Sequence, residues 1–375
     1  MIAELPSLRL EGARLRVVAL PLVSPFTTSF GTQTRREAVL VEVYGEGLRG
    51  LGECAAGVEP GYSYETRETS LEALRSYILP AVVGAEPSTP TQLAARWSWV
   101  RGHNMAKAAA EMAILDLAGK MAGRSLAAIL GGTKEEIPSG VSIGIQPSLP
   151  ATLTMIEGYL AEGYRRIKLK CKPGYDIELA AEVRRAFPAT ALMLDANSAY
   201  TLSDLERLRQ LDRFELMMIE QPLAHDDLVD HAALQAEMET PICLDESVES
   251  MADLRAAFRL GSGRILNIKA GRVAGLIPAL AIHDACLAEG WPVWCGGMLE
   301  TGIGRAANLA LASLPGFTLP GDTSASDRYY HQDILETPFR LSSHGTLPVP
   351  TGPGLGVVVD EAALDRATVH LEVIS

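Results

Sequence analysis

The chain has 375 residues, of which 47% are hydrophobic and 21% are charged, with 34 glycines and 22 prolines. This composition excludes collagen-like, coiled-coil and wholly disordered proteins, and the length suggests two domains or one large barrel with an appendage. The 46 acidic residues exceed the 33 basic ones and give a formal charge of −13, which argues against nucleic acid and anionic membranes as partners.

The sequence also shows no targeting or membrane segment. It contains no stretch of about 18 apolar residues, and its first ten residues lack the basic and apolar regions of a signal peptide. The five cysteines form no CxxC pair, which is typical of buried free thiols in a reducing compartment. We therefore expect a soluble, cytoplasmic enzyme.

The first third of the chain is predicted to be an α+β domain. Residues 8–54 alternate apolar and polar positions in short runs, which is typical of antiparallel strands, and we expect a loop at 24–34. Residues 70–130 have apolar residues at three- and four-residue spacing, which indicates helices. We place this capping domain at 1–133.

From Pro138 onward, short apolar runs alternate with amphipathic helices, which is the pattern of βαβ units. The eight predicted strands are 141–145, 166–170, 191–195, 216–220, 242–246, 265–269, 292–296 and 317–322. Eight strands linked by seven helices predict a modified TIM barrel, (β/α)7β, over 134–325. An open doubly wound sheet is less favoured, because no GxGxxG or GxxxxGK[ST] motif occurs. Residues 326–375 are expected to return to the capping domain.

Charged residues interrupt the apolar runs at or next to the ends of five consecutive predicted strands. They are Lys170, Asp195, Glu220, Asp245 and Lys269, separated by 25, 25, 25 and 24 positions. The C-terminal ends of barrel strands meet at one mouth, where barrel enzymes place their active sites. One polar residue at a strand end is ordinarily only the first solvated position, but five in register indicate a site.

The three carboxylates in this set suggest a metal site. Asp195, Glu220 and Asp245 would repel one another and could not all ionise together without a cation. Oxygen ligands of this kind suit Mg²⁺, and no histidine accompanies them to indicate Zn²⁺.

The two lysines flank the carboxylates and suggest acid/base chemistry. An ordinary lysine is protonated near neutral pH, but a metal ion or a neighbouring cation lowers its pKa. Lys168 lies on the same strand face as Lys170, and Arg272 follows Lys269 by three positions, so each lysine has a supporting cation. This arrangement suits abstraction of a proton α to a carboxylate, with Mg²⁺ stabilising the enediolate.

Further residues are expected around a small carboxylate substrate, although ordinary packing or turn formation explains each of them as well. They are Ser142 and Asn197 as orienting groups, Gly296, Gly297 and Met298 after the seventh strand, and Phe26 and Tyr62 on loops of the cap.

Five short motifs resemble those of the enolase superfamily, in particular its muconate-cycloisomerase-type branch. They are KLK at 168–170, DAN at 195–197, EQP at 220–222, DES at 245–247 and NIKAGRVAG at 267–275. Three longer segments resemble the o-succinylbenzoate synthase / N-succinylamino acid racemase family. They are SPFTTSFGTQTRREAVLVEV at 24–43, GGMLETGIGRAANLALASLPGF at 296–317 and GPGLGV at 352–357.

The resemblance implies roles for the same residues. It makes the three carboxylates the ligands of Mg²⁺, or of another divalent cation such as Mn²⁺ or Co²⁺, and makes Lys170 and Lys269 the acid/base pair. Arg272 matches an arginine typical of the racemising branch. The resemblance also implies a homo-oligomer, namely an octamer, and a physiological role in either menaquinone biosynthesis or amino-acid conversion.

Several reactions stay open at this point. Racemisation of N-acyl or N-succinyl amino acids and dehydration of 2-succinyl-6-hydroxy-2,4-cyclohexadiene-1-carboxylate both proceed through an enediolate. Muconate cycloisomerase and dipeptide epimerase activities use the same base pair, although DTSAS at 322–326 replaces the DxD motif of the epimerases. A Schiff-base lysine aldolase is an alternative from another class, and it leaves the three aligned carboxylates unexplained.

Overall fold

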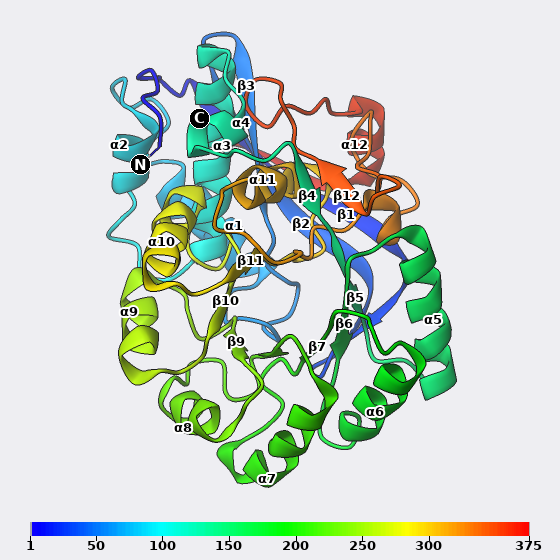
Figure 1. Cartoon of the computed structure of the whole chain (residues 1–375). Helices are drawn as coiled ribbons and strands as arrows, with labels where there is room; N and C mark the ends of the chain where they lie inside the picture. Colours follow the sequence, from blue (N-terminus) through cyan, green and yellow to red (C-terminus); the bar gives the residue numbers. More distant parts are fainter. Residues whose placement is uncertain (1, 375) are drawn as a thin grey trace.

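The computed structural model describes residues 2–374 and contains two main sheets. A seven-stranded parallel sheet curls into a barrel that is surrounded by helices, and a four-stranded antiparallel sheet stands beside it (Figure 1). The predicted architecture, an enolase-like modified TIM barrel with an N-terminal α+β cap, is therefore confirmed.

The antiparallel sheet has the strand order β13-β1-β2-β3. Its strands are β1 (Gly12–Thr27), β2 (Thr32–Gly45), β3 (Leu48–Cys54) and β13 (Thr368–Ile374). The first two strands form a long hairpin whose pairing runs from Gly12 and Tyr44 to Thr27 and Thr32. The expected loop at 24–34 is thus mostly strand. Its small polar residues suit this end of the hairpin, which is partly or fully exposed rather than packed in the core.

Helices of the cap cover one face of this sheet. They are α1 (Arg67–Ala73), which continues as a π-helical turn (Leu74–Ile78), α2 (Pro90–Ala95), α3 (Asn104–Ala122) and α4 (Leu126–Leu130). The long helix α3 lies directly against β3, where Gly50 and Gly52 face it. A Cβ atom at either glycine would collide with the backbone carbonyl of Ala113 or Ala109, so the close approach of strand and helix requires glycine.

The parallel sheet has the order β11-β10-β9-β8-β7-β6-β5. Its strands are β5 (Gly140–Ile143), β6 (Arg166–Lys170), β7 (Leu192–Asp195), β8 (Ile219–Glu220), β9 (Ile242–Leu244), β10 (Ile265–Ile268) and β11 (Val293–Cys295). The helices that follow them are α5 (Leu149–Glu162), α6 (Ile177–Ala186), α7 (Leu205–Leu208), α8 (Val229–Glu237), α9 (Met251–Leu260), α10 (Leu276–Glu289) and α11 (Gly302–Ala312). Each of the first seven predicted strands overlaps one of these.

The eighth predicted strand, 317–322, does not form a continuous strand. Phe317 makes one bridge to Val293 of β11, and Gly321 makes one to Ser139 just before β5. Pro320 between them has no N–H to donate, which interrupts a regular ladder. The segment still spans the gap between the first and last strands of the barrel, because the Gly140 N–H donates to the Gly321 carbonyl at 2.8 Å.

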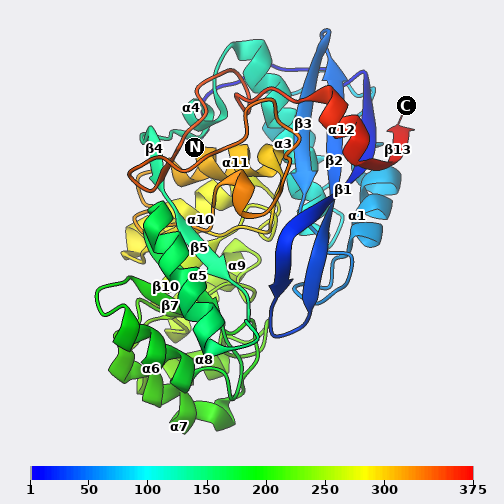
Figure 2. The ribbon, with the colours of Figure 1, turned by 90° about the vertical axis from the view of Figure 1, so that its right-hand side faces the viewer.

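The last part of the chain runs back along both units. Strand β12 (Thr346–Pro348) pairs with β4 (Glu136–Pro138) next to the barrel. Helix α12 (Glu361–Ala367) and β13 then lie beside the N-terminal strands, where β13 pairs antiparallel with β1 (Figure 2). The division into 1–133, 134–325 and 326–375 stays a prediction.

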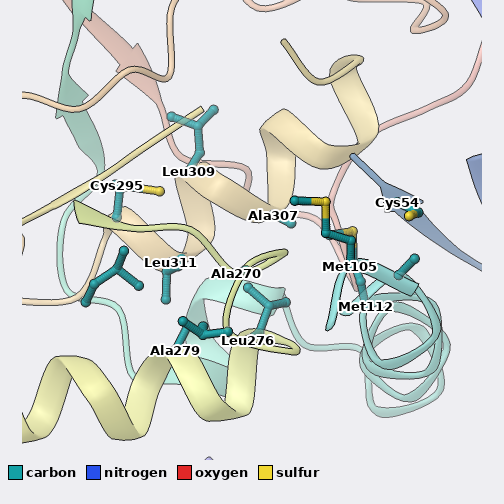
Figure 3. Close-up of a cluster of buried hydrophobic side chains, with 14 of the residues drawn as sticks. Cys54, Met105, Met112, Ala270, Leu276, Ala279, Cys295, Ala307, Leu309 and Leu311 are labelled. Carbon is teal, nitrogen blue, oxygen red and sulfur yellow. The ribbon is translucent and has the colours of Figure 1, made fainter. Parts of the chain in front are cut away.

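One hydrophobic core joins the cap to the barrel. Figure 3 shows Met105 and Met112 of α3 and Cys54 of β3 in the same buried cluster as Ala270 and Leu276 of the barrel. A second cluster fills the barrel interior below its mouth, and its buried members are Met193, Met218, Cys243, Ile265 and Trp294. This continuous packing holds the cap in place over the strand ends.

Two further features concern the cysteines and the lengths of the helices. All five cysteines are buried and free, as predicted. Across residues 2–374, no helix is both long and apolar enough to cross a membrane.

Candidate active site

The five charged residues predicted at the strand ends lie together at the mouth of the barrel. Lys170, Asp195 and Glu220 are the last residues of β6, β7 and β8, and Asp245 and Lys269 directly follow β9 and β10. The parallel register places Lys170 opposite Asp195, and Asp195 opposite Glu220. All five are buried, and the most exposed of them, Lys170, has a relative exposure of only 8%.

Each lysine of the predicted acid/base pair contacts one of the aspartates. Lys170 Nζ lies 2.6 Å from Asp195 Oδ2, and Lys269 Nζ lies 2.6 Å from Asp245 Oδ2. Arg272 also pairs with Asp245 through Nη1. Three strands, β7 to β9, separate β6 from β10 in the sheet, so the two lysines reach the mouth from different walls.

Lys168 lies below this pair and connects three carboxylates. Its Nζ is 2.9 Å from Glu220 Oε2, 3.0 Å from Asp195 Oδ2 and 2.6 Å from Asp322 Oδ2. Arg166, two residues earlier on β6, pairs with the other oxygen of Asp322 at 2.7 Å. The cation expected to support Lys170 therefore serves mainly to balance buried negative charge.

Burial and charge shift the pKa values of the three central carboxylates in opposite directions. Burial, followed by the charge of Asp195, raises the pKa of Glu220 to about 8. Burial would also raise the pKa values of Asp195 and Asp245, but the neighbouring cations, led by Lys170 for Asp195 and by Lys269 for Asp245, together outweigh it and lower both. Glu220 is therefore the carboxylate with the least compensating positive charge.

The sequence predicts a lowered pKa for Lys269, but in this arrangement of side chains its pKa is raised. Burial would lower the pKa of Lys269, but the surrounding acidic groups, led by the carboxylate of Asp245, together outweigh burial and raise it. Burial acts in the same way on Lys168, where Asp322 and Glu220 raise the pKa well above its ordinary value. The physical reason is that each lysine directly contacts a carboxylate, whereas Arg272 contacts Asp245 rather than Lys269.

The chemistry of the donor set fits a divalent cation, although the side chains do not form a finished coordination shell. Asp195, Glu220 and Asp245 offer only oxygen ligands, are at most 1% exposed, and lie on consecutive strands. Within residues 2–374, no three Asp, Glu, His or Cys side chains are arranged to hold a metal ion. Lysine ammonium groups instead supply the positive charge that these carboxylates require.

A cavity of ≈ 80 Å³ lies above these residues, between the barrel mouth and the cap. Its lining includes Lys168, Lys170 and Lys269 together with six of the seven predicted substrate-binding residues, namely Phe26, Tyr62, Ser142, Asn197, Gly297 and Met298. The volume of this cavity is smaller than the volume of sites that hold drug-sized ligands. A substrate as large as those ligands therefore requires the cap segments that line the cavity to shift.

Two of these residues contact the lysines directly. Tyr62 Oη accepts a hydrogen bond from Lys269 Nζ at 3.0 Å and donates one to Asp245 Oδ1 at 3.0 Å. Asn197 Oδ1 accepts from Lys170 Nζ at 2.5 Å, and its Nδ2 donates to Glu246 Oε1 at 2.9 Å. A residue of the cap and a residue of the barrel thus orient one lysine each.

Gly296, the seventh predicted residue, is not part of the cavity lining. A Cβ at this position would lie 2.6 Å from Lys269 Cε and would also collide with the Asn267 side chain. Glycine at 296 therefore leaves room for the lysine rather than for the substrate.

Several lining residues were not predicted from the sequence. They are Thr28, Gln33, Arg36, Leu299, Asp322 and Tyr329. Asp322 could have been found, because it ends an apolar run at the expected βα spacing, as the other carboxylates do. The remaining residues, which come from the cap hairpin or from loops after the last barrel strands, carry no such signal.

Comparison with known proteins places the whole chain in one family. Residues 152–363 match the family described as "Enolase C-terminal domain-like", and residues 12–131 match the N-terminal domain of the mandelate racemase / muconate lactonizing enzyme family. A member of the enolase superfamily from Listeria innocua has the same fold, with a TM-score of 0.94 and 42% identity over 98% of this chain and 99% of that one.

Two relatives carry the names of two different reactions. An o-succinylbenzoate synthase from Geobacillus kaustophilus is 52% identical over 363 residues, or 96% of each chain. An N-succinylamino acid racemase from an Amycolatopsis species is 51% identical over 362 residues, or 96% of this chain and 98% of that one. Members of the enolase superfamily use divalent metal ions. This chain is therefore an enzyme of the enolase superfamily and belongs to its o-succinylbenzoate synthase / N-succinylamino acid racemase family.

Proposed function

We propose that this enzyme removes the proton α to a substrate carboxylate and does so in two reactions. It racemises N-acyl and N-succinyl amino acids, and it dehydrates 2-succinyl-6-hydroxy-2,4-cyclohexadiene-1-carboxylate to o-succinylbenzoate. One observation carries the proposal. Lys170 and Lys269 line the same cavity from different walls of the barrel, with three buried carboxylates on the strand ends from β7 to β9. The names of the two relatives with 51% and 52% identity support both reactions.

We further assign Asp195, Glu220 and Asp245 as the ligands of a divalent cation, and we choose Mg²⁺ because all of the donors are hard oxygens. Mn²⁺ and Co²⁺ are the other candidates. When bound, the cation supplies positive charge opposite the negative charge that develops on the substrate carboxylate.

In racemisation the two lysines act on opposite faces of the α-carbon. Lys170 Nζ, in its neutral form, takes the α-proton, and the electron pair of the C–H bond moves into the carboxylate. The ammonium group of Lys269 then delivers a proton to the other face, so the product is the enantiomer and nothing is gained or lost. Asn197 and Tyr62 hold the two amine groups through the hydrogen bonds described above.

In dehydration Lys170 again takes the α-proton. The electron pair forms the new double bond of the ring while the C–O bond of the neighbouring carbon breaks, and the hydroxyl leaves as water with the proton that Lys170 has taken. N-succinyl amino acids and the cyclohexadiene substrate share a carboxylate beside the reacting carbon and a succinyl arm, so one cavity can serve both.

The alternatives have weaker support. Asp322 already pairs with Lys168 and Arg166, so its carboxylate is not free to bind the α-ammonium group of a dipeptide. Muconate cycloisomerase activity uses the same lysines and is tested with its own substrate. A Schiff-base aldolase has no use for three buried carboxylates.

The experiment that tests the proposal is α-proton exchange, followed by NMR. Both enantiomers of N-succinylmethionine and of N-acetylmethionine are incubated separately in D₂O with enzyme and Mg²⁺, with EDTA as the control and optical rotation measured in parallel. Exchange that depends on metal and is accompanied by loss of rotation supports the racemase. Absence of exchange with either enantiomer removes the racemase activity, and formation of o-succinylbenzoate is then measured separately.

The homo-oligomer, the octamer implied by the resemblance and the cytoplasmic location stay predictions. Size-exclusion chromatography with light scattering measures the number of subunits, and a mass near eight chains supports the octamer.

A further inference from the structure

Arg36 is a buried cation that the proposed reaction does not yet use. It lies on β2 of the cap, has a relative exposure of only 3%, and lines the same cavity as Lys170 and Lys269. It also lines an adjoining cavity of ≈ 260 Å³ between residues 30–37 and 58–61. Arg36 therefore stands where a substrate arm that extends from the lysines toward the cap would pass.

The guanidinium of Arg36 has no acidic partner within residues 2–374. Its one hydrogen bond runs from Nη2 to the backbone carbonyl of Ala55, and its Nε is buried without any partner. By contrast, Lys170, Lys269 and Arg272 each contact a carboxylate. A buried guanidinium without a negative partner is costly, because burial removes its hydration and nothing replaces it.

Two buried carboxylates of the cap, Glu53 and Glu65, are already engaged elsewhere. Glu53 accepts backbone N–H groups at the N-terminus of α11, and Glu65 accepts those at the N-terminus of α3. Neither forms an ion pair with Arg36. The N–H donors of the guanidinium that have no protein partner are therefore available to a ligand in the cavity.

We propose that Arg36 binds the second carboxylate of the substrate, at the far end of the succinyl arm. This inference rests on the proposed function and adds the residue that recognises the acyl group. A planar guanidinium with free N–H donors suits a carboxylate, which can accept two parallel hydrogen bonds. The succinyl arm is common to both proposed substrates, so one arginine serves racemisation and dehydration.

The test compares two ligands that differ only at the end of this arm. N-succinyl-L-methionine ends in a carboxylate, whereas N-succinamoyl-L-methionine ends in a neutral amide of the same length. Calorimetry measures the binding of each in the presence of Mg²⁺ to the wild type, Arg36→Met and Arg36→Lys. Arg14→Met is the matched control, because Arg14 lies on the neighbouring strand β1, is exposed and lines neither of the two cavities.

We expect Arg36→Met to weaken binding of the succinyl ligand by about 10- to 100-fold, the range for a lost hydrogen bond to a charged group. Binding of the succinamoyl ligand should change less than about 3-fold, and Arg14→Met should change the binding of neither ligand. Arg36→Lys keeps the charge but loses the paired donors, so we expect an intermediate loss for the succinyl ligand alone. This second variant also decides the matter if Arg36→Met does not fold.

Two results would overturn the inference. Equal weakening of both ligands would show that Arg36 only supports the cap through Ala55, and unchanged binding would show that it does not reach the arm. Racemisation is measured separately on the same proteins. If binding depends on the charge of the arm but no proton exchange occurs, the proposed function is removed and the role of Arg36 stands. If exchange occurs but binding does not depend on that charge, the proposed function stands and the role of Arg36 is removed.

Discussion

The mouth of the barrel and the cap above it contribute to one cavity in different ways. The barrel supplies Lys170, Asp195 and Glu220 from the ends of neighbouring strands, where the hydrogen-bonded ladder fixes their spacing. The cap supplies Phe26 and Tyr62 from a hairpin end and a loop, which meet the barrel only through tertiary packing. The reacting groups therefore lie on strand ends that the sheet holds in place, and the cap residues that contact a substrate lie on a loop and a hairpin end.

The largest effects should come from the barrel side of this comparison. We expect Lys170→Met and Lys269→Met each to reduce racemisation by about 10²- to 10⁴-fold, the range for loss of a general acid or base. Polarimetry with N-succinyl-L-methionine measures the rate. Lys172→Met is the control, since Lys172 is exposed just beyond β6. A racemisation rate close to that of the wild type in either variant would contradict the two-base account.

Binding of the metal ion at the same strand ends should stabilise the folded protein. We expect EDTA to abolish activity, and Mg²⁺ at 100 times its dissociation constant to stabilise the fold by about 2.7 kcal/mol. Thermal unfolding with and without Mg²⁺ measures this shift. Asp195→Asn and Glu220→Gln should remove it, whereas Glu206→Gln on the exposed surface should keep it. An unchanged shift in both site variants would place the cation elsewhere.

The close packing of the Lys269 side chain against Gly296 predicts a smaller loss of activity. In Gly296→Ala the new Cβ meets the lysine side chain, so Lys269 must move and kcat should fall by about 10-fold, because reacting groups misplaced by about 1 Å lose much of their rate. Steady-state kinetics measure kcat. Gly158→Ala in α5, where a Cβ meets open space, is the control. Unchanged kcat in Gly296→Ala would mean that Lys269 does not depend on this space.

The smallest effect concerns the cap interface and its dependence on pH. Burial raises the pKa of Glu111 to about 8 in the folded protein, where it accepts the N–H of Ile277 at the start of α10 at 3.2 Å. The folded state thus binds this proton more tightly than the unfolded state does. Its contribution to stability is complete below about pH 4 and is lost as the pH rises toward 8.

Glu111→Gln should remove this part of the pH dependence. The slope attributable to Glu111 is at most about 1.4 kcal/mol per pH unit, and urea unfolding between pH 5 and 8 measures it in the wild type and the variant. Parallel stability curves for the two proteins would show that Glu111 keeps its ordinary pKa.

The barrel site could be predicted from the sequence because its signal is local. Lys170, Asp195 and Glu220 each end an apolar run, and repetition at one βα spacing identifies the mouth of a barrel. Asp245 and Lys269 follow the same rule one residue beyond their strands. A regular ladder converts this linear spacing directly into proximity in space.

The remaining features depend on information that no local pattern carries. Tyr62 and Lys269 are 207 positions apart, and only the packing of the cap on the barrel brings them into contact. In the sequence, nothing distinguishes Arg36 from other charged residues of a hairpin. Only the position of the hairpin over the cavity in the folded protein does so. The eighth strand was predicted from its apolar run, but Pro320 within that run interrupts the ladder.

The most direct test of the central claim asks which face of the α-carbon each lysine serves. The L and D enantiomers of N-succinylmethionine are incubated separately in D₂O with Lys170→Met or Lys269→Met, and NMR follows loss of the α-proton. We predict that each variant exchanges the proton of one enantiomer without racemising it, and that the two variants choose opposite enantiomers. Exchange of the same enantiomer by both variants would contradict the placement of the two lysines on opposite faces.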